Sequence, residues 1–260
     1  MSAYTCLDYA VAEGVATITL SRPDRLNALS TKLLEELQSA VRKARKDEET
    51  RVLVITGAPR KDGRPCFSAG DDLKEMAAGV PMPPGLGAEI CNMLDDLLKP
   101  TIAVIDGICS TGAVEIALAC DLRIVSETAQ ISDWHLKNLG NGLGGWGAST
   151  RWVRAVGLQH AKDIILTGKV VDGIEAHRIG FAARVFPSAA LMDGARAVAC
   201  QIAAMDPNGV RVTLAHLDRV EDMTRDQALR FAQLLPGWFD VRANLSGFAA
   251  SFSDKKKGDE

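Results

Sequence analysis

The alternation of strand-like and helix-like segments in the first half of the chain constrains the fold most. Two short runs, Tyr9–Val11 and Val15–Leu20, flank turn residues 12–14 and predict a β-hairpin. Ser30 then precedes a segment with apolar residues at helical spacing, and the β-branched run Val52–Thr56 follows. This strand–helix–strand unit predicts a parallel sheet covered by helices.

The same pattern continues to about residue 186 and then gives way to helices. The core should contain a helix over Ala88–Leu98, a strand over Thr101–Ile105, an apolar helix from about Gly112 and a strand over Leu122–Val125. The last part of the chain should contain helices over Ala189–Met205, Asn208–Val220 and Thr224–Val241. We therefore expect an α/β core over residues 1–186 and a helical C-terminal region over residues 187–260, with a mobile loop at Met76–Gly87.

Charge and composition exclude several classes of protein. The 30 basic and 33 acidic residues are interleaved, so no basic stripe suits a nucleic acid. The chain begins without a leader-like segment and lacks the run of about 18 apolar residues that spans a bilayer, which predicts a cytoplasmic protein without a membrane segment. Six cysteines without CxxC spacing and four histidines suggest reduced thiols and no metal site.

Two glycine-containing segments have the composition of ligand-binding loops. In Cys66–Leu73, small residues at 68–70 allow the backbone to approach a ligand closely, although an ordinary glycine turn would look the same. In Asp106–Asp121, Gly112 opens an apolar helix, where unpaired N–H groups can hold an oxyanion. Each segment follows an expected strand.

Glu115 is the ionisable residue of this apolar helix. A carboxylate among Val114, Ile116 and Ala117 is expensive to bury without a partner. A positioned acid/base would explain its presence, and so would a carboxylate that caps a nearby loop or pairs with an arginine.

Four segments in this order resemble the crotonase (enoyl-CoA hydratase/isomerase) family, and the resemblance covers nearly the whole chain. They are Ser21–Leu29, Cys66–Leu73, Gly107–Asp121 and Ile165–Asp172. The resemblance implies a crotonase-like ββα spiral core whose C-terminal helices build a homotrimer or homohexamer. It also implies that the substrate is an acyl-CoA thioester, with coenzyme A as part of the substrate and no separate cofactor.

The resemblance assigns roles to individual residues. The backbone N–H groups of Ala69 and Gly112 would form the oxyanion hole, and Glu115 matches the first of two hydratase glutamates. Residues expected to contact CoA are Arg25, Ala28, Ser68, Gly70, Asp71, Asp72 and Leu73. Lysines 255–257 of the polar tail are a further candidate for the CoA phosphates, although a solvated charge run is the simpler interpretation.

The chain departs from the hydratase pattern at the second glutamate, whose position falls on His135. His135 and Asp133 are candidate replacements, because either can move a proton near neutral pH in a suitable environment. Trp134 and Trp146 are expected to shape the acyl pocket and favour a cyclic or aromatic acyl group.

Two other crotonase families resemble this region in part. The Trp134–His135 pair is similar to the 4-chlorobenzoyl-CoA dehalogenases, but their nucleophilic aspartate would fall on Gly142. Gly144–Ser149 is similar to the dihydroxynaphthoyl-CoA synthases, which lack a glutamate at the position of Glu115.

The expected function is hydration or dehydration of an enoyl-CoA through a thioester enolate. Other crotonase reactions stay open: isomerisation, C–C bond hydrolysis or synthesis, and dehalogenase-like chemistry. A non-catalytic scaffold or RNA-binding member is the alternative from another class. The apolar setting of Glu115 beside Gly112 favours an enzyme, and the absence of a basic surface disfavours RNA.

Overall fold

A computed structural model of the chain describes residues 4–239 and 241. The chain forms two compact units, Met1–Met205 and Asp206–Glu260. The division therefore falls after Met205 and not at 186/187, because helix α8 (Leu191–Ala203) packs on the sheet of the first unit. Lysines 255–257 lie outside the described residues.

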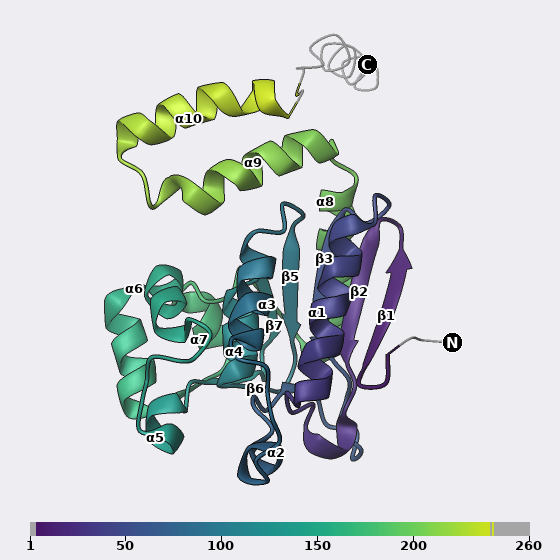
Figure 1. The fold of residues 1–260 in the computed structure, drawn as a ribbon, viewed down its shortest axis with the longest axis vertical. Helices are drawn as coiled ribbons and strands as arrows, with labels where there is room; N and C mark the ends of the chain where they lie inside the picture. Colours follow the sequence, from purple (N-terminus) through teal and green to yellow (C-terminus); the bar gives the residue numbers. More distant parts are fainter. Residues whose placement is uncertain (1–3, 240, 242–260) are drawn as a thin grey trace, which may run out of the picture. The chain divides into compact units, whose positions relative to one another are not determined.

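The larger sheet of the first unit confirms the expected hairpin and parallel strands (Figure 1). Its order is β1 (Leu7–Ala12), β2 (Val15–Leu20), β3 (Val52–Gly57), β5 (Thr101–Ile105), β7 (Leu122–Ser126) and β10 (Arg184–Phe186). β1 and β2 are antiparallel, whereas every other neighbouring pair is parallel. The sequence pattern did not indicate β10.

A second, smaller sheet was not predicted from the sequence. Its order is β4 (Cys66–Ser68), β6 (Ile108–Ser110), β8 (Gln130–Ser132) and β9 (Val170–Val171). β4, β6 and β8 each follow one strand of the larger sheet along the chain and precede a helix. This repeated strand–strand–helix unit is the expected ββα spiral. It pairs β4 with β6, and each of these strands lies within one of the two glycine-containing segments.

The helices of the first unit are α1 (Thr31–Lys46), α2 (Leu73–Ala77), α3 (Leu86–Asp95), α4 (Gly112–Leu118), α5 (His135–Leu139), α6 (Ala148–Thr167), α7 (Gly173–Arg178) and α8; the 3₁₀ turns are η1 (Pro23–Arg25) and η2 (Ser188–Ala190). Ser30 caps α1 by accepting the N–H of Leu33 at 3.1 Å. Alternate residues of β3 face opposite sides of the sheet: Leu53 and Ile55 share a core with α1, and Val52 and Val54 share one with α8.

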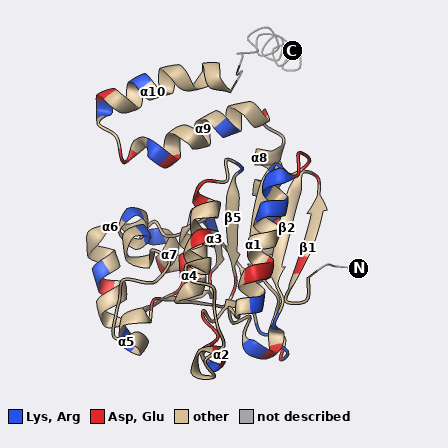
Figure 2. Ribbon diagram, viewed as in Figure 1, with Lys and Arg blue, Asp and Glu red and all other residues tan. Residues whose placement is uncertain are grey.

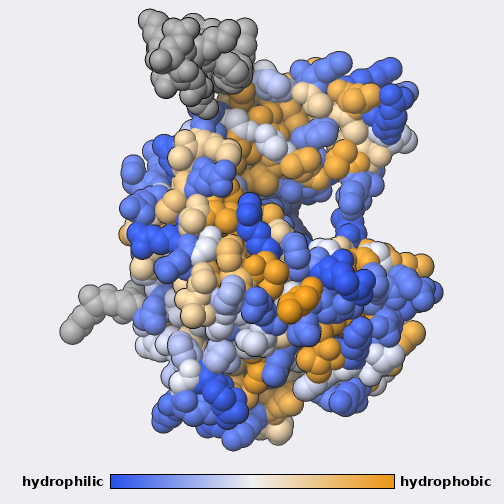
Figure 3. Space-filling view, turned by 180° about the vertical axis from the view of Figure 1, so that it is seen from behind, coloured by the Kyte–Doolittle hydropathy of each residue, from blue (hydrophilic) through white to orange (hydrophobic). Residues whose placement is uncertain are grey.

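The second unit contains α9 (Pro207–Val220) and α10 (Arg225–Trp238), close to the two helices expected there. No residue of α9 is buried in the described structure, and α10 buries only Ala228 and Leu235. Large apolar side chains are exposed on this pair of helices (Figure 3), namely Leu217, Leu229, Leu234 and Trp238. Two helices that bury so little of their own surface need another surface for stability.

Basic and acidic residues alternate over the described ribbon, and both occur along α1 (Figure 2). Among the described residues, no helix is long and apolar enough to cross a membrane. All six cysteines are free, and Cys66, Cys91, Cys109 and Cys120 are buried.

Candidate active site

The two glycine-containing segments meet at the ends of β4 and β6. Gly70 has a φ of +87°, and a Cβ atom there would lie 1.9 Å from Oγ1 of Thr111 and 2.5 Å from the carbonyl oxygen of Ser110. Only glycine permits this backbone conformation and this close approach. The glycine turn of the first segment is therefore required for the second segment to pack beside it.

A cavity of about 270 Å³ opens beside these loops. Four of the predicted site residues line it: Ala69, Asp71, Leu73 and Trp134. The other lining residues were not predicted from the sequence: Leu26, Ile108, Ser110, Thr111, Gln130, Ser132, Asn138, Leu139 and Val170. Most of them lie on the short strands of the unpredicted sheet or on α5, so the pattern of the sequence carried no signal for them.

One of the two predicted oxyanion donors is already engaged. The N–H of Ala69 donates to the carbonyl oxygen of Leu26 at 3.0 Å. In contrast, the N–H groups of Gly112 and Asp71 donate to no other described residue, and that of Asp71 faces its own carboxyl group. The positive φ of Gly70 turns the backbone between Ala69 and Asp71. The available pair of donors is therefore Gly112 and Asp71, and Asp71 lies two residues after the expected donor, Ala69.

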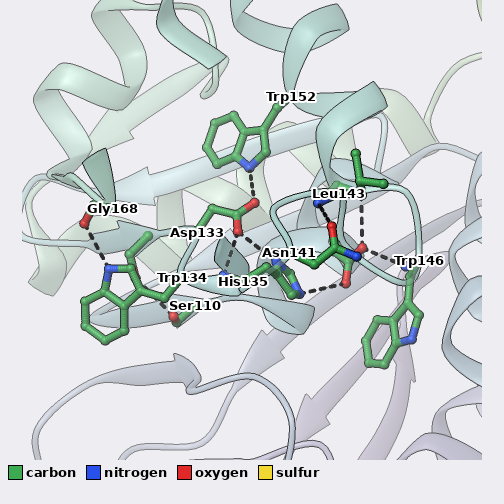
Figure 4. Close-up of polar contacts among 12 residues, drawn as sticks. Ser110, Asp133, Trp134, His135, Asn141, Leu143, Trp146, Trp152 and Gly168 are labelled. Atoms are coloured by element: carbon green, nitrogen blue, oxygen red, sulfur yellow. Dashed lines mark hydrogen bonds and ion pairs between the residues drawn. The ribbon is translucent and has the colours of Figure 1, made fainter. Parts of the chain in front are cut away.

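Glu115 is 1% exposed, and its carboxylate is fully satisfied by hydrogen-bond donors. Its Oε1 accepts the backbone N–H of Trp146 at 2.8 Å and that of Ala148 at 3.0 Å (Figure 4). These bonds connect α4 to the loop that enters α6. A carboxylate held by two N–H groups and a third partner can stay charged in an apolar setting.

The third partner of Glu115 is His135. Its Nε2 lies 3.3 Å from Oε2 of Glu115, and its Nδ1 lies 2.7 Å from Oδ1 of Asp133. Asp133 is fixed in turn by the indole N–H of Trp152, which donates to Oδ2 at 3.0 Å (Figure 4). The structure thus brings together the three predicted catalytic side chains in one buried row, which we call the relay: Asp133, His135 and Glu115. Trp152 fixes the Asp133 end of this row.

The relay carries a proton on its central member. Burial opposes a charge on His135, but hydrogen bonds to Asp133 and Glu115 outweigh it and raise the pKa of His135 to about 10. The two carboxyl groups that flank His135 therefore favour its imidazolium form at neutral pH.

The two predicted pocket tryptophans occupy different positions. Trp134 lines the cavity, and its indole N–H donates to the carbonyl oxygen of Gly168 at 3.0 Å, which fixes the ring. Trp146 packs over Gly112, where an added Cβ would lie 2.8 Å from its ring. The same ring would block a Cβ on Gly87 at 2.0 Å. Trp146 thus packs against Gly112 at the start of α4.

Asp72, expected to contact CoA, is occupied by protein groups. Its Oδ2 forms an ion pair with Arg22 at 2.9 Å, and its Oδ1 caps α2 by accepting the N–H groups of Lys74 and Glu75. Burial opposes its charge, but Arg22 and the backbone N–H groups of Glu75 and Lys74 together outweigh this effect and lower the pKa of Asp72. The side chain therefore orients the loop.

Ser68 and Ala28 also support the loop from within. The Ser68 hydroxyl is buried and accepts the N–H of Gly70 at 3.2 Å. The carbonyl oxygen of Ala28 accepts a hydrogen bond from the guanidinium of Arg22. Both residues belong to the framework of the loop, and their contact with CoA stays a prediction.

Arg25 lies in a second, open cavity of about 410 Å³ at η1. Arg60 and Lys61, which the sequence analysis missed, line the same cavity together with Asp24 and Asp62. Three cations and two carboxylates leave a positive balance, which suits the phosphates of a CoA thioester. Leu26 lines both this cavity and the acyl cavity, so the two are adjacent.

Replacing both cations in Arg60→Ala/Lys61→Ala is expected to weaken CoA binding about tenfold, because each removes a charge-assisted contact. Calorimetric titration with CoA at low and high salt measures the effect, which should shrink as salt screens the charges. Arg64→Ala is the matched control, since Arg64 binds Asp62 at 2.7 Å and does not line the cavity. Equal affinity of the double variant and the wild type would contradict this assignment.

Comparison with known proteins agrees with this geometry. Residues 10–256 match the family model described as enoyl-CoA hydratase/isomerase. A probable enoyl-CoA hydratase of Mycobacterium bovis is 34% identical over 246 residues, covering 93% of this chain and 92% of the relative. The (E)-benzylidenesuccinyl-CoA hydratase of Thauera aromatica is 32% identical over 250 residues, covering 92% and 93%. The crystal structure of an enoyl-CoA hydratase from Bacillus anthracis superposes with a TM-score of 0.87 at 29% identity, covering 96% and 97%.

The spiral core and the two meeting loops define a crotonase-fold acyl-CoA enzyme. The chain belongs to the enoyl-CoA hydratase/isomerase family.

Proposed function

We propose that the protein adds water to, or removes it from, an enoyl-CoA thioester whose acyl group is cyclic or aromatic. The observation that carries the proposal is the buried relay beside two unused N–H groups. In this reaction the N–H groups of Gly112 and Asp71 hold the thioester oxygen as it gains negative charge. No cofactor is needed, because these donors and the relay supply the charge stabilisation and the proton transfers.

The relay accounts for both proton transfers of the reaction. Glu115 takes a proton from water as the water oxygen bonds to the β-carbon, and the electrons of the double bond move onto the thioester oxygen. The enolate then collapses as its α-carbon takes a proton from the relay. One proton enters the relay and one leaves it, so the Asp133–His135–Glu115 row ends as it began. The reverse sequence removes water.

The shape of the acyl cavity supports the substrate class. Trp134 lines it with a ring that is fixed by the bond to Gly168, and a rigid aromatic wall packs well against a planar acyl group. The relative from Thauera aromatica is named as a hydratase of such an acyl group, benzylidenesuccinyl-CoA.

The test separates enolate formation from hydration. Mass spectrometry in D₂O should detect deuterium at the α-carbon of a saturated acyl-CoA, and this exchange should disappear in Gly112→Pro, which lacks the N–H donor. Among linear, cyclic and aromatic enoyl-CoA thioesters, crotonyl-CoA should be hydrated slowly. Rapid hydration of crotonyl-CoA that is insensitive to His135→Ala and Asp133→Ala would overturn the assignment of the relay.

An isomerase is the second candidate, and one feature favours it. The relay is a single connected row, and a single acid/base can remove a proton at one carbon and return it at another. Movement of a double bond in a 3-enoyl-CoA without uptake of ¹⁸O from labelled water would identify this reaction.

We further propose a homotrimer or homohexamer in the cytoplasm, with the α9–α10 pair in the subunit interface. The exposed apolar side chains of this pair support the proposal, because burying them would supply the stability that the pair lacks. Sedimentation equilibrium distinguishes three from six subunits. A monomer at micromolar concentration would exclude both.

A further inference from the structure

Asp71 is a carboxyl group of the acyl cavity that the relay does not use. It lines the cavity, and no other described side chain binds its carboxylate. Its Oδ1 lies 3.2 Å from the point that a Cβ on Gly112 would occupy. The carboxyl therefore stands next to the two N–H groups that would hold a thioester oxygen.

The surroundings of Asp71 disfavour its charged form. Burial is the main cause that raises the pKa of Asp71, and the charge of Glu115 on α4 adds to it. His135 on α5 and the backbone N–H of Asp71 itself act in the opposite direction. The neighbouring Asp72 carries the Arg22 ion pair, so that cation is already engaged.

We propose that Asp71 acts as a neutral carboxylic acid in the acyl cavity and donates a hydrogen bond to the thioester oxygen of the bound acyl-CoA. The inference rests on the proposed function, since it concerns the same oxygen. It adds a side-chain donor to the two backbone donors, Asp71 N–H and Gly112 N–H.

Charge decides between the two protonation states of Asp71. An ionised carboxylate beside the developing enolate would repel it in a site with little water. A neutral carboxyl instead presents an O–H group to the same oxygen, and a carboxylic acid kept neutral by its setting is an effective donor to an oxyanion. Substrate binding excludes water and brings a partly negative oxygen close, so the pKa of Asp71 should rise further in the complex.

The resulting pH dependence has a definite sign. The productive form is protonated, so turnover should be highest at low pH and should fall as pH rises through the pKa of Asp71. The midpoint of this fall should lie at higher pH in kcat, which reports the complex, than in kcat/KM, which reports the free enzyme. Titration of His135 would not be mistaken for that of Asp71. The pKa of His135 is about 10, so a decrease in turnover caused by His135 would occur at more alkaline pH.

The experiment compares Asp71→Asn and Asp71→Ala by deuterium exchange at the α-carbon between pH 5 and 9. Asp71→Asn keeps a hydrogen-bond donor in its amide, so its exchange rate should stay within about tenfold of the wild-type rate. Its rate should not decrease as pH rises, because the amide does not titrate. Asp71→Ala should also show no fall, and its kcat should lie about 10²-fold below the wild-type value at low pH, the scale for one oxyanion donor. Asp163→Asn, an exposed carboxyl-to-amide change on α6, is the matched control.

Proton uptake on binding is the second readout and does not need turnover. Calorimetric titration with a saturated acyl-CoA in two buffers of different ionisation enthalpy should detect proton uptake by the wild type and by Asp163→Asn, but not by Asp71→Asn. If both Asp71 variants exchanged the α-proton at the wild-type rate and with the wild-type pH profile, this inference would be overturned and the proposed function would stand. A protein that neither binds acyl-CoA nor exchanges the α-proton would overturn both.

Discussion

Glu115→Gln should lower the rate of α-proton exchange and of hydration by about 10²-fold or more, which is the usual contribution of a positioned acid/base. The amide can neither take the proton of water nor return it. Stopped-flow or mass-spectrometric turnover assays measure the loss. CoA affinity by calorimetry should be unchanged because the cavity at η1, which we propose for CoA, is untouched.

The same change should also reduce the free energy of unfolding by about 1–3 kcal/mol. Glu115 accepts bonds from three donors, on Trp146, Ala148 and His135, and a glutamine presents one oxygen and one NH₂ group to them. One donor is therefore left facing another donor.

Glu36→Gln is the matched control for this effect on stability. Glu36 is also a buried carboxylate, and it accepts the backbone N–H groups of Thr5 and Cys6 on another part of the core. Its amide variant should lose comparable stability and keep full turnover per folded molecule. If Glu115→Gln kept full activity, the assignment of Glu115 as the acid/base would be wrong.

His135→Ala should have the largest effect on stability, a loss of about 3–5 kcal/mol at neutral pH. The substitution removes the cation that Glu115 and Asp133 share and leaves two buried carboxylates without it. Urea unfolding at pH 7 measures the loss. Hydration should also fall further than α-proton exchange, because the return of the proton depends on the complete relay.

The pH dependence of that stability follows from the raised pKa. The folded-state pKa of His135, about 10, lies above its ordinary value of 6.5. The stabilisation by the imidazolium is therefore complete below about pH 6.5 and is lost as pH rises through 10. The difference in unfolding free energy between the wild type and His135→Ala should shrink over this range.

His177→Ala tests whether that behaviour is specific to the relay. His177 is an exposed histidine of the first unit, and its Nδ1 meets the carbonyl oxygen of Ala182 at 3.0 Å. Its loss should lower stability by a smaller amount. A difference between wild type and His135→Ala that stays constant from pH 6 to pH 10 would show that His135 is neutral in the folded protein.

Local patterns determined much of the fold in advance. The hairpin of β1 and β2 follows from alternation around a turn, and α1 begins where Ser30 can cap it. β3 and β5 are mostly apolar runs, as strands buried on both faces require. These features depend on residues close together in the chain, so the sequence alone carries them.

The smaller sheet and the boundary between units needed the tertiary structure. Strands of two or three residues, such as β4 and β9, are too short to show any periodicity, and pairing with β6 and β8 creates them. Likewise, the apolar face of α8 does not predict which surface the helix packs against. Because α8 packs on the larger sheet, the boundary between the units falls after residue 205 and not after residue 186.

For the site, the sequence by itself determined which residue types were present: glycines that open two loops, a glutamate in an apolar helix, and a histidine where a second glutamate is expected. Only the tertiary structure decided how they act together. It engaged the N–H of Ala69 with Leu26 and left that of Asp71 available, and it joined Asp133, His135 and Glu115 in one row. The physical reason is that hydrogen-bond partners and burial depend on the folded backbone, since distances of 3 Å between residues twenty positions apart are created only when β6, β8 and α4 pack together.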